Sequence, residues 1–253
     1  DCSWSRGLGD VYKRQPIPVQ PTAHYAMGGI PTDVHSRVLS DEKGTVLPGV
    51  YAAGEAACVS VHGANRLGTN SLLDIVVFGK RAGQSMVDYV TQTKPNSISD
   101  SASDDLSKKI QNLIDKEHTD EFSVANIRKD LQESMEENAK IFRTKETLEK
   151  QTEILEELRE RYENVTIFDK SKVHNSELVE AIELDYLLDM SEATVASALA
   201  RNESRGAHSR QDFPDRDDTN FMKHSFAFKK DNSANLKYKD VELGKYEPME
   251  RKY

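Results

Sequence analysis

The chain has 253 residues, of which 37% are hydrophobic and 30% are charged, and its formal net charge is −9. This composition supplies enough apolar residues for the cores of one or two domains, and its acidity argues against nucleic-acid binding, which requires a basic face. No apolar run reaches the roughly eighteen residues of a membrane span, since the longest, residues 72–78, is interrupted by Asp74, and the two cysteines indicate neither a metal cluster nor a disulfide framework.

Residues 1–15 differ in character from the rest of the chain. They begin without an initiator Met, show no apolar periodicity and include Trp4, the one tryptophan of the chain. The segment looks like translated adapter sequence, so we expect a non-native leader and exclude it from the fold, with a divergent native loop as the alternative. In either case we interpret the chain as a C-terminal fragment that starts in the middle of a domain.

Residues 16–92 predict an α/β domain. Residues 50–53 read as a short apolar run of strand type that ends at a glycine, with the carboxylate of Glu55 just beyond it. The Asn-Ser pair at residues 70–71 is a preferred helix cap, so we predict a buried helix N-terminus there. It opens a segment, residues 72–90, that is apolar nearly all round in its first two turns. A strand, a turn with an acid and a helix N-terminus form a recurring site for sugar hydroxyls and electron-rich oxygens, which indicates a nucleotide or a flavin.

Two basic side chains in this domain are candidates for ligand binding. His24 opens the extended segment HYAMGGIPT (residues 24–32), whose Gly28–Gly29 pair allows the backbone to approach a ligand closely, and Arg66 lies in a loop of small and polar residues. An arginine offers a planar fork matched to a carboxylate, and a histidine supplies a second donor, so together they could bind a dicarboxylate. Taken alone, a histidine in a strand is more often structural.

Residues 93–105 are a polar linker rich in Ser and Asp, and residues 106–202 then change to helical periodicity. Four stretches of apolar residues recur at helical spacing, with Ser123 and Asn175 as the expected caps of the second and fourth. Three or four amphipathic helices with short connections predict a helical bundle. A coiled-coil scaffold is less favoured, because the apolar stripes are short and interrupted.

The tail, residues 203–253, has a different pattern. Its first part alternates arginines with aspartates around a Gly, a His and a Pro, which predicts an ion-pair network that locks the tail against the rest of the protein. Residues 236–253 alternate apolar and polar residues enough for an edge strand, followed by a charged end.

The seven histidines of the chain show no ligand-type spacing, so no metal site is predicted.

Three long motifs in this order resemble the flavoprotein subunit of succinate dehydrogenase and fumarate reductase. They are HYAMGGIPT (residues 24–32), AAGEAACVSVHGANRLGTNSLLDIVVFGK (residues 52–80) and ESRGAHSRQDFPDRDD (residues 203–218). With the segments between them, the resemblance covers residues 16–253. It implies the C-terminal part of an α/β FAD-binding domain, followed by an α-helical bundle and an extended tail that packs back on the flavin domain.

The resemblance also implies roles for five residues. His24 and Arg66 fall on the family's substrate-binding His and Arg, which would contact the carboxylates of succinate or fumarate. Glu55, Ser71 and Leu72 fall on positions that contact FAD, where free N–H groups at a helix end would stabilise negative charge on the reduced flavin. The family's catalytic Arg, its flavin-attaching His and its Gly-rich phosphate turn are expected N-terminal to this chain, so we predict no catalytic residue here and an inactive fragment.

In the complete protein the family resemblance implies oxidation of succinate to fumarate in the tricarboxylic acid cycle and respiratory chain, with electrons passing from FAD to an iron–sulfur subunit. Membrane-anchor subunits would hold the complex at the cytoplasmic face of a prokaryotic inner membrane, or at the matrix side in mitochondria. Fumarate reductase and L-aspartate oxidase are the alternative enzymes, and a module for assembly or docking only is the non-enzyme alternative. Convergence of His24 and Arg66 on one cavity beside Ser71 would favour the enzyme.

Overall fold

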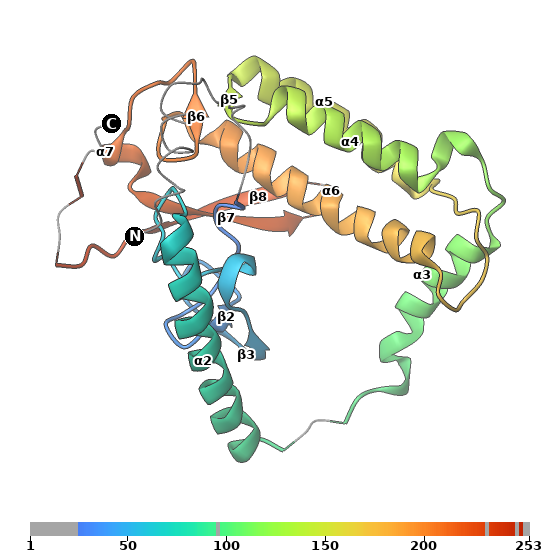
Figure 1. Cartoon of the computed structure of the whole chain (residues 1–253), viewed down its shortest axis with the longest axis horizontal. Coiled ribbons are helices and arrows are strands. Elements are labelled where there is room, and N and C mark those ends of the chain that lie inside the picture. The colour runs from blue at the N-terminus through green and yellow to red at the C-terminus, as the bar shows by residue number, and fades with distance from the viewer. Residues whose placement is uncertain (1–24, 95–96, 231–232, 246–247, 250–253) are drawn as a thin grey trace, which may run out of the picture.

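The computed structural model describes residues 25–94, 97–230, 233–245 and 248–249. The predicted leader and His24 lie outside these residues. The described chain mixes helix and sheet: a small α/β part with one long helix, a group of helices, and a C-terminal segment that contains a β-hairpin (Figure 1).

Short strands build the α/β part. A parallel pair joins β1 (Ile30–Pro31) to β4 (Ala57–Cys58), and an antiparallel pair joins β2 (Arg37–Leu39) to β3 (Val46–Tyr51). The strand predicted at residues 50–53 is therefore earlier and longer than expected. Gly54, at φ +75°, starts a 3-10 turn, η1 (Gly54–Ala56), which carries Glu55.

The long helix α2 (Gly68–Gln92) begins earlier than the sequence indicated. Its N-cap is Leu67, which makes no side-chain capping bond, and Ser71 lies one turn inside the helix. The N–H and the hydroxyl of Ser71 both donate to the carbonyl of Leu67, at 2.9 and 3.2 Å. The prediction that residues 70–71 cap the helix is therefore wrong, because backbone geometry sets the start three residues upstream.

Helix α2 packs along one side against the β2–β3 hairpin. Tyr51 donates its hydroxyl to the Ser85 carbonyl (3.2 Å), and Ser36 donates to the Phe78 carbonyl (2.9 Å). The helix buries three of its residues, Ser71, Asp74 and Ala82. Apolar side chains of its first turns remain exposed, Leu72 and Val76 at 67% and 70%. A buried helix N-terminus was predicted: Ser71 and Asp74 in the first two turns are buried, but the apolar side chains there are not, since a two-stranded hairpin covers only one face.

Four helices form the bundle: α3 (Asp104–Asp115), α4 (Val124–Asn138), α5 (Lys145–Glu163) and α6 (Ser176–Ala200). Short 3-10 turns precede two of them, η2 (Asp100–Ser103) before α3 and η3 (Asp120–Phe122) before α4. Ser123 caps α4 and Asn175 caps α6, as predicted: each side-chain oxygen accepts from the backbone N–H three residues on, at 3.4 and 2.8 Å. In Figure 1, α4 and α5 lie side by side above α6.

The bundle holds the largest core of the described chain. Leu148, Leu155 and Leu158 of α5 lie on one face at the predicted spacing and are almost completely buried, against Leu184 and Leu188 of α6. Complete burial of a leucine side chain stabilises the folded state by about 1.5–3 kcal/mol. None of the described helices is both long and apolar enough to cross a membrane.

The C-terminal segment returns along the bundle. β6 (Ser209–Arg210) pairs in parallel with β5 (Phe142–Arg143), and the short helix α7 (Asp218–Phe221) leads into β7 (Lys223–Lys230) and β8 (Ser233–Asp240). The last two strands form an antiparallel hairpin beside α6 (Figure 1). The edge strand predicted within residues 236–253 thus begins at Ser233, and its partner β7 was not predicted, because its alternating sequence is rich in lysine.

Candidate functional site

Four of the five predicted site residues border one hollow beside the start of α2. The hollow has a volume of about 300 Å³ and is lined by Tyr25, Glu55, Arg66, Gly68, Ser71, Leu72 and Ile75. We call it the Arg66 hollow. It brings η1, the loop before α2 and the first turns of α2 together. The fifth residue, His24, lies outside the described residues, so its convergence with Arg66 stays a prediction.

The guanidinium of Arg66 is buried, with the residue 5% exposed, yet its hydrogen bonds are long. Nη1 lies 3.4 Å from Asp74 Oδ2, and Nη2 lies 3.4 Å from both the Glu55 and the Ala57 carbonyls. Nε has no hydrogen-bond partner among the residues that the structure describes. Buried polar groups are normally well satisfied, so this arginine keeps donor capacity for an anionic ligand.

Asp74 holds this arginine from the α2 side. Its Oδ2 accepts from Nε2 of His62 at 2.8 Å as well as from Arg66, and the carboxylate is 3% exposed. In the described chain, Oδ1 of Asp74 and Nδ1 of His62 find no partner. The buried carboxylate of Asp74 thus holds the positively charged guanidinium of Arg66 at one side of the hollow. No role was predicted for Asp74 beyond its interruption of an apolar run, although a lone acid in such a run is a signal for a buried ion pair.

The predicted cofactor residues Glu55 and Ser71 both make hydrogen bonds within the chain. Glu55 is exposed, and its Oε1 accepts from the Ala26 N–H at 3.1 Å. The expectation of a free N–H at Ser71 is wrong, because that amide already donates to Leu67. The amides that have no partner inside the helix are those of residues 68–70, in its first turn. Gly68 lines the hollow, so the positive end of α2 still faces it.

The Gly28–Gly29 pair serves the chain itself. Gly29 has φ +136°, and a Cβ built there would lie 2.7 Å from the Ala56 carbonyl oxygen, so a side chain does not fit. The sequence predicted that the backbone at these glycines approaches a ligand closely; in the structure it approaches η1 instead. This packing also places Met27 so that its Sδ accepts from the Arg66 N–H at 3.0 Å.

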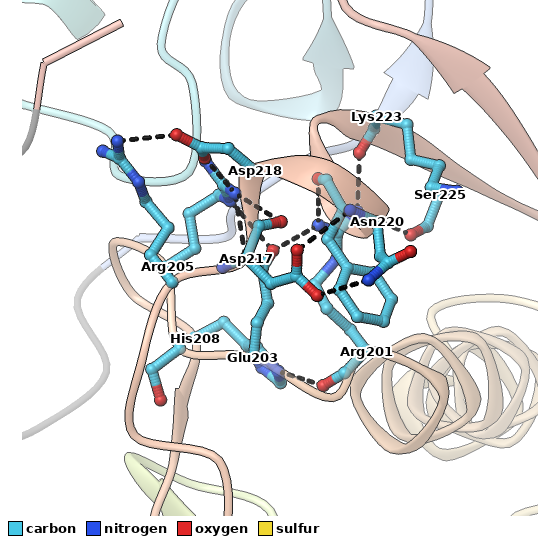
Figure 2. A network of polar contacts seen from close by, with 12 residues as sticks. Arg201, Glu203, Arg205, His208, Asp217, Asp218, Asn220, Lys223 and Ser225 are labelled. Carbon is cyan, nitrogen blue, oxygen red and sulfur yellow. Dashed lines mark hydrogen bonds and ion pairs between the residues drawn. The ribbon is translucent and has the colours of Figure 1, made fainter.

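An ion-pair network fixes the start of the tail, as predicted (Figure 2). Glu203, fully buried, accepts four hydrogen bonds: Arg201 Nη1 at 2.7 Å, Arg205 Nε at 2.8 Å, Arg205 Nη2 at 2.9 Å and the Asp217 N–H at 2.9 Å. Arg205 also reaches Asp218, at 2.7 Å. A carboxylate whose lone pairs are all used by charged or backbone donors makes a rigid joint.

A second buried arginine ties the tail to the end of α6. Arg210 donates from Nε and Nη2 to Asp212, at 2.8 and 2.7 Å, and these bonds hold the pKa of the Asp212 carboxyl well below its usual range. Its Nη1 donates to the carbonyls of Ala198 and Leu199, both at 3.1 Å. These last carbonyls of α6 need an external donor, so Arg210 completes the helix end.

We expect acid to destabilise the tail through His208. Burial, with the nearby charges of Arg143, Arg210 and Arg201, lowers the pKa of this imidazole, although its hydrogen bond to the Arg201 carbonyl acts the other way. Nδ1 accepts from Arg143 Nη1 at 3.0 Å and Nε2 donates to Arg201 O at 3.1 Å, an arrangement that only the neutral ring can make.

Because the folded pKa is the lower one, the unfolded chain binds the proton first, and stability falls as the pH drops below about 6.5. The measurement is the melting temperature between about pH 8 and pH 5 for the parent and for His208→Gln, which should lose part of this slope. The exposed His35→Gln is the control. An identical slope in the His208 variant would contradict the assignment.

Two family models match the chain. "Fumarate reductase flavoprotein C-term" matches residues 128–253, and "FAD binding domain" matches residues 4–72. The succinate dehydrogenase flavoprotein subunit of Rickettsia bellii is 48% identical over 223 residues, which is 86% of this chain. The fumarate reductase flavoprotein subunit of a Serratia species is 42% identical over 95% of the chain. The chain spans 37% and 40% of the length of these two relatives.

Solved structures agree with these matches. A mutant form of E. coli quinol fumarate reductase superposes with a TM-score of 0.82 at 37% identity, covering 98% of this chain and 42% of that one. Mycobacterium smegmatis Sdh1, in a complex with UQ1, superposes with a TM-score of 0.73 at 32% identity, covering 87% of this chain and 36% of that one.

Proposed function

Because the chain belongs to the family of succinate dehydrogenase and fumarate reductase flavoproteins, we propose that its Arg66 binds one carboxylate of succinate or fumarate. The observation that carries this proposal is the buried guanidinium beside a hollow, with long hydrogen bonds and an Nε that no described residue satisfies. His24, the residue before Tyr25 at the hollow, is proposed as the second donor to the dicarboxylate.

We further propose that Glu55, Ser71 and Leu72 hold FAD, the cofactor of this flavoprotein family. The hollow suits a large, flat, electron-rich group: it offers the exposed apolar side chains of Leu72 and Ile75, an acceptor in Glu55, and first-turn amides of α2 that have no partner within the helix. When bound, FAD would supply the two-electron chemistry that interconverts succinate and fumarate. The chain's own part is to orient the dicarboxylate and to present positive charge from Arg66 and the helix end.

The other parts of the activity are proposed from the relatives. The chain spans only 37% of the Rickettsia relative, so we infer that the groups that transfer the proton and bind the FAD phosphates come from outside it, and that this chain by itself does not oxidise succinate. An iron–sulfur subunit and membrane-anchor subunits are the proposed partners. The proposed location is peripheral, at the cytoplasmic face of a bacterial inner membrane.

The test is a titration of the complete FAD-loaded flavoprotein subunit with malonate, followed by flavin absorbance, for the parent and for Arg66→Ala. Loss of a charged contact to a carboxylate should cost about 2–3 kcal/mol, which weakens malonate binding by tens-fold to over a hundredfold. Arg81→Ala is the control, since Arg81 is exposed on α2 and does not line the hollow. If Arg66→Ala keeps its flavin and binds malonate as the parent does, Arg66 is structural and the proposal fails.

A further inference from the structure

The loop that carries Arg66 is held from three sides: the Arg66 N–H donates to Met27 Sδ, His62 bonds to Asp74, and the tail contacts it at Ala64. Residues 59–66 join β4 to α2 without regular structure, and both Ser60 and Gly63 have positive φ. Within the described residues, one backbone–backbone hydrogen bond ties this loop to another element: the N–H of Ala207 donates to the carbonyl of Ala64 at 2.9 Å. The contact comes from the tail, far along the chain, and it lies two residues from Arg66.

The tail approaches the loop so closely that only glycine fits. Gly206 has φ +60°, and a Cβ built there would lie 2.4 Å from the carbonyl oxygen of Ala64, 2.6 Å from its carbonyl carbon and 2.8 Å from its Cβ. Real Cβ atoms do not come this near to backbone. Any side chain at Gly206 must therefore push Ala64 and its neighbours aside.

The turn that makes this contact is itself held rigidly. Arg205 and His208 form an isolated β-bridge, with hydrogen bonds of 2.8 Å from the Arg205 N–H and 3.0 Å from the His208 N–H. The side chain of Arg205 is fixed by the buried Glu203 and by Asp218 (Figure 2). The ion-pair network around Glu203 thus places a stiff turn against the loop that carries Arg66.

We propose that residues 205–208, here named the tail clip, position Arg66 for its carboxylate. This inference rests on the function proposed for Arg66. The hydrogen bonds of the guanidinium to the described residues are long, so its place also depends on the course of its backbone. That backbone is held by Met27 at Arg66 itself and by the clip at Ala64. The clip residues act through Arg66 and are positioning residues. A displacement of about 1 Å in a binding group can lower reactivity by up to about a hundredfold.

The first variant is Gly206→Ala in the complete FAD-loaded subunit, with malonate affinity read from flavin absorbance. We expect binding weaker by on the order of tenfold while the flavin stays bound. Gly44→Ala is the matched control: Gly44 also has positive φ, +91°, but nothing lies within 4 Å of its added Cβ, so it carries backbone strain without a collision. Should Gly206→Ala fail to fold, Ala207→Pro removes the N–H donor itself and is measured in the same way.

A double-mutant cycle separates positioning from general damage. If the clip acts through Arg66, the clip variant weakens malonate binding in the parent but hardly at all when Arg66 is already alanine. If the clip variant weakens malonate binding equally in both backgrounds, the positioning role of the clip is overturned. The same holds if the clip variant binds malonate like the parent while Arg66→Ala binds it more weakly. If Arg66→Ala itself leaves binding unchanged, it is the proposed function that fails.

Discussion

Replacing Asp74 by Asn is expected to lower the melting temperature of the FAD-loaded subunit by on the order of 10 °C. The substitution keeps the shape of the side chain and removes its charge. Arg66 is then a buried cation without a counter-ion, and removal of one partner from a buried ion pair costs about 3–5 kcal/mol. The second partner, His62, loses a charge-assisted hydrogen bond of 2.8 Å.

Asp88→Asn is the control for this prediction, because Asp88 is exposed on the same helix and the exchange is chemically identical. Malonate affinity should fall together with stability, since Asp74 is the side-chain anchor of the guanidinium. The measurement is thermal unfolding followed by circular dichroism, with malonate titration on the same samples. A melting temperature equal to that of the Asp88 variant would mean that the carboxylate contributes nothing.

Glu203→Gln is the second variant expected to have a large effect. Each oxygen of Glu203 accepts two hydrogen bonds, so the amide of a glutamine would set its NH₂ group against two donors whichever way it is turned. The two arginines on it would also lose their shared counter-ion. Breaking a buried network of this kind costs about 3–5 kcal/mol, again on the order of 10 °C in melting temperature.

The same variant tests the acid response of the tail. Burial by itself raises the pKa of Glu203, but the hydrogen bonds from Arg205, from the Asp217 N–H and from Arg201 outweigh it, so the folded pKa is lowered. A lowered carboxyl pKa gives stability that is complete above the ordinary pKa and is lost as the pH falls through the folded one. Glu203→Gln should remove that part of the acid dependence, and the exposed Glu242→Gln should retain it.

Local signals in the sequence predicted the bundle well. Ser123 and Asn175 cap their helices, and the stripe from Leu148 to Tyr162 is buried along one face of α5. These features depend on side chains within one or two turns of each other, which a single sequence shows directly. The long motifs likewise identified the family, which the comparisons agree with.

The start of α2 shows where local signals fail. Asn70 and Ser71 have good capping chemistry, but the helix begins after Leu67, which offers no cap. The loop before it is held by contacts with Met27 and Ala207, from distant parts of the chain, and these fix where helical geometry can start. Capping preference is worth about 1 kcal/mol, so tertiary contacts override it easily.

The site could be predicted only in part, because it too depends on contacts between distant parts of the chain. Glu55, Arg66, Ser71 and Leu72 stand close together in one motif, and they line one hollow. The ion pair between Arg66 and Asp74 could not be predicted without the position of the helix start, which determines whether the two side chains face each other. The contact of Gly206 with Ala64 joins two motifs about 140 residues apart, and a single sequence gives no signal for such a pairing.

That separation along the chain has a consequence for biosynthesis. A ribosome adds about 5–20 residues per second, so the segment with Ala64 emerges on the order of ten seconds before Ala207 is made. During that interval the loop that carries Arg66 lacks the hydrogen bond that the tail donates to Ala64. A message cut short before residue 207 would therefore yield a product in which the loop of Arg66 lacks this hydrogen bond from the tail, however well its helices had folded.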